Sequence, residues 1–224
     1  MIISNAIAVM ALAAGCLSAA WIVRHEWRHR QAMWIMYPVW PLVALSGGPL
    51  ILLLYHRVAA QKKRTPFWLA TAVATCHCGA GCTLGDLSAE TLATVHPAAL
   101  VPFGLGWATE QPIFAGWGLD FALAYAIGIV FQYFSIAPMR NLGLWEGIVA
   151  ALKADTLSLI GWQLGMYGAM AIAQFLVFPA ILGHPVTASS PVFWFAMQIA
   201  MIAGFATSYP VNILLLRLGW KERM

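Results

Sequence analysis

Charge is what this sequence has least of. Only 9% of its 224 residues are charged and 62% are hydrophobic, whereas soluble domains carry about 25% charged residues. This scarcity excludes an ordinary water-soluble domain. The net charge of +4 does not indicate a nucleic-acid partner, because the basic residues lie between apolar runs, as in loops that orient membrane helices. We expect an all-α, polytopic helical bundle in contact with a lipid bilayer.

Cysteine is also scarce, and the common catalytic signatures are missing. Three of the four cysteines lie within the short segment 76–82, which excludes a framework of disulfides stapling distant parts of the fold. The chain contains no nucleophile elbow, phosphate loop, dinucleotide fingerprint or HExxH segment. Whether the protein is an enzyme therefore stays open.

Long apolar runs divide the chain. A bilayer-spanning helix needs about 20 apolar residues, and six runs qualify: 2–23, 36–56, 67–93, 115–137, 150–181 and 191–216. We divide the chain into a first helix with its basic connection, 1–35, and a helical membrane domain, 36–224. The second run contains several prolines and glycines, which predicts a broken or re-entrant helix. Either all six runs cross the membrane, or run 36–56 is re-entrant and the N-terminus lies outside. We favour six full crossings.

The basic residues predict the orientation of these helices. Lys and Arg are missing from the connections 94–114 and 182–190, which places these connections outside and the C-terminus in the cytoplasm. Arg24, Arg28 and Arg30 conflict with this rule if run 36–56 crosses fully. The residues that support it are Arg57, Lys62, Lys63, Arg64, Arg140, Arg217, Lys221 and Arg223. We expect a bacterial cytoplasmic (inner) membrane protein.

The segment 76–86, CHCGAGCTLGD, carries most of the chemistry. On a helix, Cys78, Cys82, Asp86 and Glu90 are four apart and share one face. The cysteines then lie near mid-membrane, where ionisable groups are costly and indicate function. Close helix packing through Gly79, Gly81 and Gly85 is the structural alternative.

Thiolate and imidazole are donors that Cu(I) and Zn(II) prefer, and cysteine with methionine selects soft Cu(I). We therefore predict a metal site formed by His77, Cys78, Cys82 and Asp86, in which Asp86 orients the histidine or relays a proton. Copper is the first candidate and zinc the second, and haem stays open because a histidine can be an axial ligand. Further candidate donors are Cys76, Glu90, Asp155, Met166, Met197 and Met201.

Other functions remain open beside metal transport, storage or sensing. A membrane oxidoreductase would use the thiols, a metal or haem on a lipid-soluble substrate, although an i, i+4 pair on one helix is poorly placed for a disulfide. Proton or ion movement would use embedded ionisable groups. A third alternative is a non-catalytic protein that assembles with its own copies or with a partner subunit. The candidate ionisable groups are Asp86, Glu90, Asp120, Lys153 and Asp155.

Five segments in order resemble one bacterial membrane family, called domain of unknown function 4396. They are WPLxALxGxP at 40–49, HCGAGCTLGD at 77–86, FQYFSIAPMR at 131–140, KADTLS at 153–158 and GFATSYPVN at 204–212. The resemblance covers roughly 36–224 and implies a multi-span membrane fold. It implies no activity, but it includes both the cysteine segment and the polar patch at Asp155.

Overall fold

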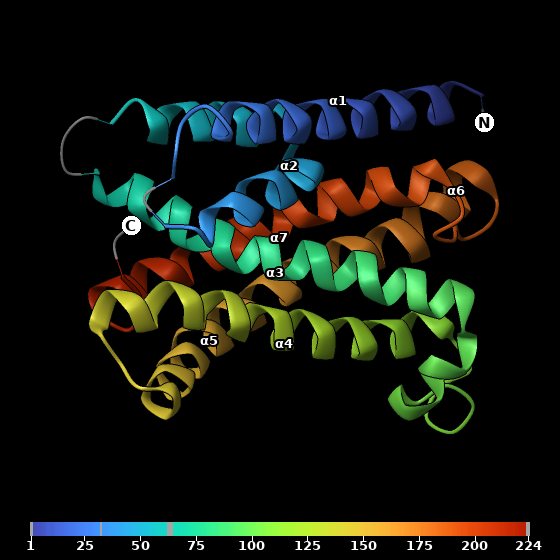
Figure 1. Cartoon of the computed structure of the whole chain (residues 1–224). Coiled ribbons are helices and arrows are strands. Elements are labelled where there is room, and N and C mark those ends of the chain that lie inside the picture. The colour runs from blue at the N-terminus through green and yellow to red at the C-terminus, as the bar shows by residue number, and fades with distance from the viewer. Residues whose placement is uncertain (1, 32, 62–64, 223–224) are drawn as a thin grey trace.

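The computed structural model describes residues 2–31, 33–61 and 65–222, and these residues form a bundle of helices that lie largely side by side (Figure 1). The helices are α1 (Ile2–Glu26), α2 (Met36–Ala59), α3 (Phe67–Val95), η1 (Pro97–Phe103), α4 (Pro112–Arg140), α5 (Leu144–Ile172), η2 (Ala173–Val177), α6 (Phe178–Leu182) and α7 (Pro191–Arg217). Six helical segments are long and apolar enough to cross a membrane, the fifth of them running through α5, η2 and α6. The predicted all-α fold is confirmed.

Helix α3 is the centre of the bundle. Its most apolar window is 83% buried, whereas the corresponding windows of the other five segments are 22–39% buried. Small residues on α3 allow the neighbouring helices to pack closely around it. A Cβ atom at Gly79 would lie 2.5 Å from the Trp162 ring of α5, and one at Gly85 would lie 2.6 Å from Ala124 Cα of α4. The glycines that pack α3 against its neighbours thus also place the cysteine segment in the interior.

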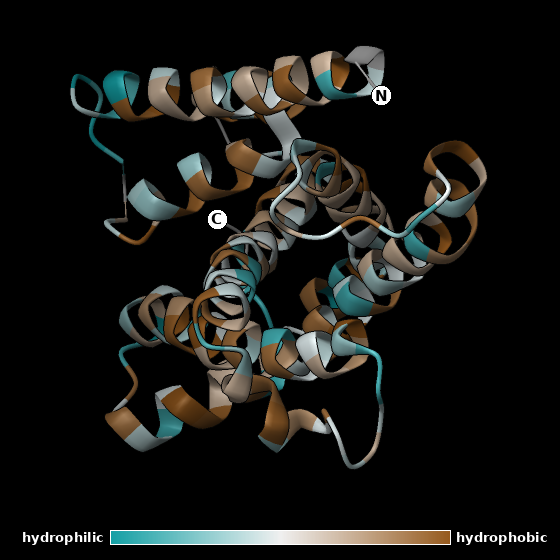
Figure 2. Ribbon diagram, turned by 90° about the vertical axis from the view of Figure 1, so that its right-hand side faces the viewer, coloured by the Kyte–Doolittle hydropathy of each residue, from teal (hydrophilic) through white to brown (hydrophobic). Residues whose placement is uncertain are grey.

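The outward surfaces of the other helices are apolar. Large hydrophobic side chains are exposed on several of them, including Leu17 on α1, Leu53 on α2 and Leu164 on α5, with 63–71% of each accessible. Figure 2 shows hydrophobic residues on all of the helices. Such a surface is suited to lipid tails and not to water, which agrees with the predicted contact with a bilayer.

Helix α2 does not continue straight through the bundle. Its backbone breaks at Gly48, where φ is 52° and ψ is −134°, a conformation that only glycine adopts readily. The rings of Trp40 and Tyr55 lie 5.4 Å apart, whereas fifteen residues of straight helix would separate them by about 22 Å. Tyr55 also lies 2.8 Å from His25 Nδ1, at the end of α1. The two halves of α2 therefore double back toward the same end of the bundle.

This geometry corrects our preference for six full crossings and selects the re-entrant alternative for 36–56. The end of α1, both ends of α2 and the start of α3 lie together at the end of the bundle that holds the C-terminus (Figure 1). Arg24, Arg28 and Arg30 consequently share that end with Arg140 and Arg217, and the conflict in the distribution of basic residues disappears. Lys62, Lys63, Arg64 and Arg223 lie outside the described residues.

The doubled-back α2 predicts where exposed positions lie in a membrane. In a Cys16→Ser background, whose other native thiols are buried, His29→Cys and Gln61→Cys should react with an impermeant maleimide from the same side of sealed vesicles. Ala108→Cys should react from the opposite side. Labelling of positions 29 and 61 from opposite sides would show that α2 crosses the membrane fully.

Candidate functional site

The cysteine segment of α3 divides its side chains between two cores. Cys76 packs in a core that includes Val39 and Trp40 of α2. His77 is 1% exposed, and its Nε2 lies 2.9 Å from Met36 Sδ, also of α2. Cys78 and Cys82 instead belong to the core built with α5 and α7. The helix therefore does not bring His77 to the thiols with which the sequence grouped it.

Cys78 and Cys82 form a pair of buried free thiols. Both are 0% exposed, and their side chains interact with each other across one turn of α3. The thioether side chains of this core come from α5 and α7: Met166, Met170, Met197 and Met201. Met201 Sδ accepts a hydrogen bond of 3.3 Å from Trp162 Nε1. The structure thus places two thiols and several thioethers in one core.

A pair of carboxyl groups lies beyond the thiols. Asp86 of α3 is 1% exposed and faces Asp120 of α4, which is 6% exposed. The Tyr167 hydroxyl donates to Asp120 Oδ2 at 3.2 Å. Neither oxygen of Asp86 accepts a hydrogen bond from a donor in the described residues. Adjacent carboxylates repel each other in an apolar interior, and a shared proton or a bound cation removes this repulsion.

One cavity reaches Asp86 and another reaches Glu90, one turn farther along α3. A cavity of about 260 Å³ between α1, α2, α3 and α7 is lined by Asp86, together with Thr83 and Met197. A second cavity, of about 340 Å³, is lined by Glu90, Gln174 and residues of the connection before α7. Glu90 also interacts electrostatically with Asp86 and Asp120. The carboxyl pair is therefore linked to the mouth of the bundle opposite the C-terminus.

Asp155 of α5 lies beside the thiols, because it contacts Gly128 of α4, which packs against Gly81 of α3. It is 0% exposed, and its Oδ1 accepts a hydrogen bond of 3.4 Å from Gln132 Nε2 of α4. Its Oδ2 points at Gly128, where a Cβ atom would collide with it, and has no hydrogen-bond partner among the described side chains and backbone. Asp155 also interacts electrostatically with Cys82. The polar patch at Asp155 and the thiols thus belong to one site.

Lys221 completes this site, and the sequence assigned it only to the basic side. It follows α7 but folds back into the bundle, where it is 3% exposed. Its Nζ donates to Asn212 Oδ1 at 2.7 Å, to Ser158 Oγ at 3.1 Å and to Ala74 O at 3.3 Å. Burial lowers the pKa of Lys221, and the nearby Cys78, Asp155 and Cys82 oppose this shift. No periodicity in the sequence marks this return.

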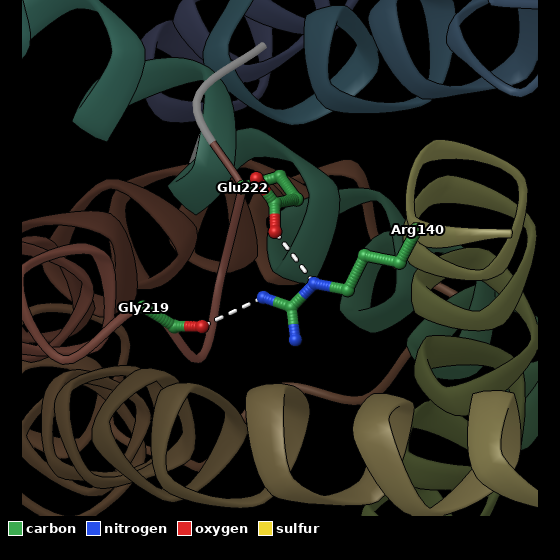
Figure 3. A network of polar contacts seen from close by, with 3 residues as sticks. All are labelled: Arg140, Gly219 and Glu222. Carbon is green, nitrogen blue, oxygen red and sulfur yellow. Dashed lines mark hydrogen bonds and ion pairs between the residues drawn. The ribbon is translucent and has the colours of Figure 1, made fainter. Parts of the chain in front are cut away.

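An ion pair fastens the segment that carries Lys221. Arg140, at the end of α4, contacts Glu222 Oε1 through Nε at 2.6 Å and donates from Nη2 to Gly219 O at 2.6 Å (Figure 3). Both charged side chains are 31% exposed. An exposed pair of this kind contributes about 0.2–1 kcal/mol. The contacts of Arg140 with Glu222 and Gly219 are here called the surface clasp. The segment 218–222 is therefore held both by this weak clasp and by buried Lys221.

The ionisable groups follow one another through the bundle and do not surround a common point. Along α3, Cys78 and Asp86 are separated by about 12 Å at 1.5 Å per residue. Among residues 2–31, 33–61 and 65–222, no three His, Cys, Asp or Glu side chains converge as a metal site would require. The candidate donors therefore do not converge on one point.

A model of the family described as "Domain of unknown function (DUF4396)" matches residues 67–221. The chain belongs to this family. The matched region runs from the start of α3 to Lys221, so it includes all of the buried ionisable groups described above. The searches of curated proteins and of solved structures found no match.

The approach of α3, α4 and α5 in this DUF4396 chain depends on Gly128. Because a Cβ at Gly128 would displace Asp155 Oδ2, Gly128→Ala should lower the stability by about 1–3 kcal/mol. Gly116→Ala on the same helix is the matched control, since a Cβ there meets nothing within 4 Å. Thermal unfolding in detergent measures both, and equal Tm values for the two variants would contradict the described packing.

Proposed function

We propose that this chain transports a soft metal cation, with Cu(I) as the first candidate and Zn(II) as the second. One observation carries the proposal. The Cys82 thiol interacts with Cys78 and also, electrostatically, with both Asp86 and Asp155. The ionisable groups therefore form a continuous series in the bundle. Embedded ionisable groups of this kind mark ion pathways in membrane proteins.

The thiols are the groups that favour a soft cation. Cys78 and Cys82 are adjacent and are surrounded by the methionines of their core, and thiolate with thioether selects Cu(I) over hard cations. His77 faces α2. Asp86 lies one turn beyond Cys82 and two turns beyond Cys78 along α3, where it faces Asp120. The proposed primary ligands are therefore the two cysteines. Met166 and Met197 remain as candidate additional donors from α5 and α7.

The spacing of the donors favours movement over storage. Conduction requires sites that bind well enough to admit the ion and weakly enough to release it. In this bundle the carboxyl pair Asp86–Asp120 and the thiol pair succeed one another along α3, and Asp155 lies beside the thiols. Asp86 borders one cavity and Glu90 another, which supports entry at the end opposite the C-terminus. Protons on the carboxyls would balance the charge of the moving cation.

We further propose a bacterial cytoplasmic membrane with the C-terminus inside. The support is the clustering of arginines at one end, including those after α1 that conflicted with six full crossings.

Binding and uptake of Cu(I) test the proposal. Wild-type protein in detergent should bind Cu(I) under reducing conditions, and Cys78→Ser or Cys82→Ser should weaken the affinity at least about tenfold, since even residues that only support a metal ligand are worth about 10–100-fold. The affinity is measured by competition with a Cu(I) chelator. Proteoliposomes containing the wild type should take up Cu(I), and those with either variant should not.

Cys76→Ser is the matched control, because Cys76 is equally buried on the same helix but faces the other core. It should bind and transport as the wild type does. Wild-type protein that binds neither Cu(I) nor Zn(II) would refute the proposal. Loss of two hydrogens upon oxidation, abolished by either Cys78→Ser or Cys82→Ser in metal-free protein, would instead indicate a thiol oxidoreductase.

A further inference from the structure

The environment of Lys221 resembles a coordination shell made of oxygen atoms. Its Nζ contacts a carbonyl of α3, a hydroxyl of α5 and an amide oxygen of α7, at 2.7–3.3 Å. These three acceptors match the three N–H groups of an ammonium. They come from three different helices, so the pocket belongs to the bundle and not to the segment that carries the lysine.

Further polar groups surround the three oxygen atoms that Lys221 contacts. Ser208 Oγ lies 3.2 Å from Ser158 Oγ, and Asn212 Nδ2 donates to Ser158 Oγ at 2.9 Å and to Ser208 O at 2.9 Å. This network fixes the direction of Asn212, so that its Oδ1 faces the ammonium. The Asp155 carboxylate, one of whose oxygens has no hydrogen-bond partner in the described part of the chain, adds negative charge nearby.

The acceptors around the Lys221 ammonium are neutral oxygen atoms. The sole ion pair among the described residues joins Arg140 and Glu222, so Lys221 is buried without a carboxylate at ion-pair distance. Lysine is almost never fully buried unless it is paired. Here neutral oxygens replace the water around the ammonium, which is also how membrane proteins bind alkali cations.

We propose that the pocket formed by Ala74 O, Ser158 Oγ and Asn212 Oδ1 is a site for a monovalent cation that prefers oxygen ligands, such as Na⁺, K⁺ or NH₄⁺, and that the Lys221 ammonium occupies it while the segment 218–222 is docked. A free cation and Lys221 then compete for the same oxygens. Release of the surface clasp between Arg140 and Glu222 favours the free cation. This site does not require a metal at Cys78 and Cys82.

Removal of the ammonium should open the pocket to free cations. The full chain in detergent is compared with Lys221→Met, which keeps an unbranched apolar side chain but carries no charge. Its Tm is measured against NaCl, KCl, NH₄Cl and, at equal ionic strength, choline chloride. At least one of the three small cations should raise the Tm of the variant in a saturable manner, because a ligand that binds only the folded state stabilises it. The wild type should need at least about tenfold more of the same cation, which corresponds to about 1.4 kcal/mol of competition.

Asn212→Leu, added to Lys221→Met, removes one oxygen at similar volume and should abolish the response. If Lys221→Met does not fold, Glu222→Gln and Arg140→Gln serve instead, because they loosen the clasp and leave Lys221 in place. Each should respond to a small cation at a lower concentration than the wild type. Trypsin cleavage after Lys221, followed by the mass of the intact chain, should then also accelerate with that cation relative to choline. Responses identical to choline in the folded variants would overturn the proposal and leave Lys221 as a structural anchor only.

Discussion

The burial of α3 is the constraint on which the rest of the structure depends. A helix surrounded by other helices must present small residues wherever a neighbour approaches closely, and α3 does so with Gly79, Gly81 and Gly85. Gly81 meets Gly128 of α4, and this close approach leaves room for the Asp155 carboxylate of α5 beside it. The same packing buries most of the polar side chains of α3, which therefore face neighbouring helices inside the bundle.

These polar partners are ordered along the helix. The carboxyl pair of Asp86 and Asp120 lies toward one end, and the thiols of Cys78 and Cys82 lie in the middle with Asp155 beside them. Lys221 contacts Ala74, nearer the start of α3 and the end of the bundle that holds the C-terminus. Each step changes the chemistry from hard oxygen to soft sulfur and back to oxygen. Such a series would strip a cation of its water in stages, and the proposed oxygen site at Lys221 lies next to it but suits a different cation. The weak clasp between Arg140 and Glu222 lies at this end, where a small change in free energy can release it.

The sequence predicted the helices well because apolar runs of sufficient length have few alternatives in a bilayer. It also identified the glycines and prolines that break α2, but not the path of the chain after the break, since a fold-back depends on contacts such as those of Tyr55 with His25. For the site, i, i+4 spacing correctly paired Cys78 with Cys82. The sequence also grouped His77 with them, but a neighbouring position on a helix is rotated by about 100°, and His77 faces Met36 of α2 instead.

Lys221 shows the other limit of the sequence. A lysine just beyond an apolar run ordinarily marks the membrane surface, and only the tertiary structure reveals that it turns back to Ser158 and Asn212. The sequence named Asp120 only as one of several candidate embedded ionisable groups, and its burial beside Asp86 follows from how α4 packs on α3. In each case the residue type was informative, but its partner lay on another helix.

The X-ray absorption spectrum of the Cu(I)-loaded chain distinguishes the proposed ligands, because it reports which atoms surround the metal. Since the thiols are adjacent in one core and His77 points into the other, we expect a first shell of sulfur atoms only, lost in Cys78→Ser and retained in Cys76→Ser. A shell containing imidazole nitrogen, or one unaffected by Cys78→Ser, would contradict this expectation.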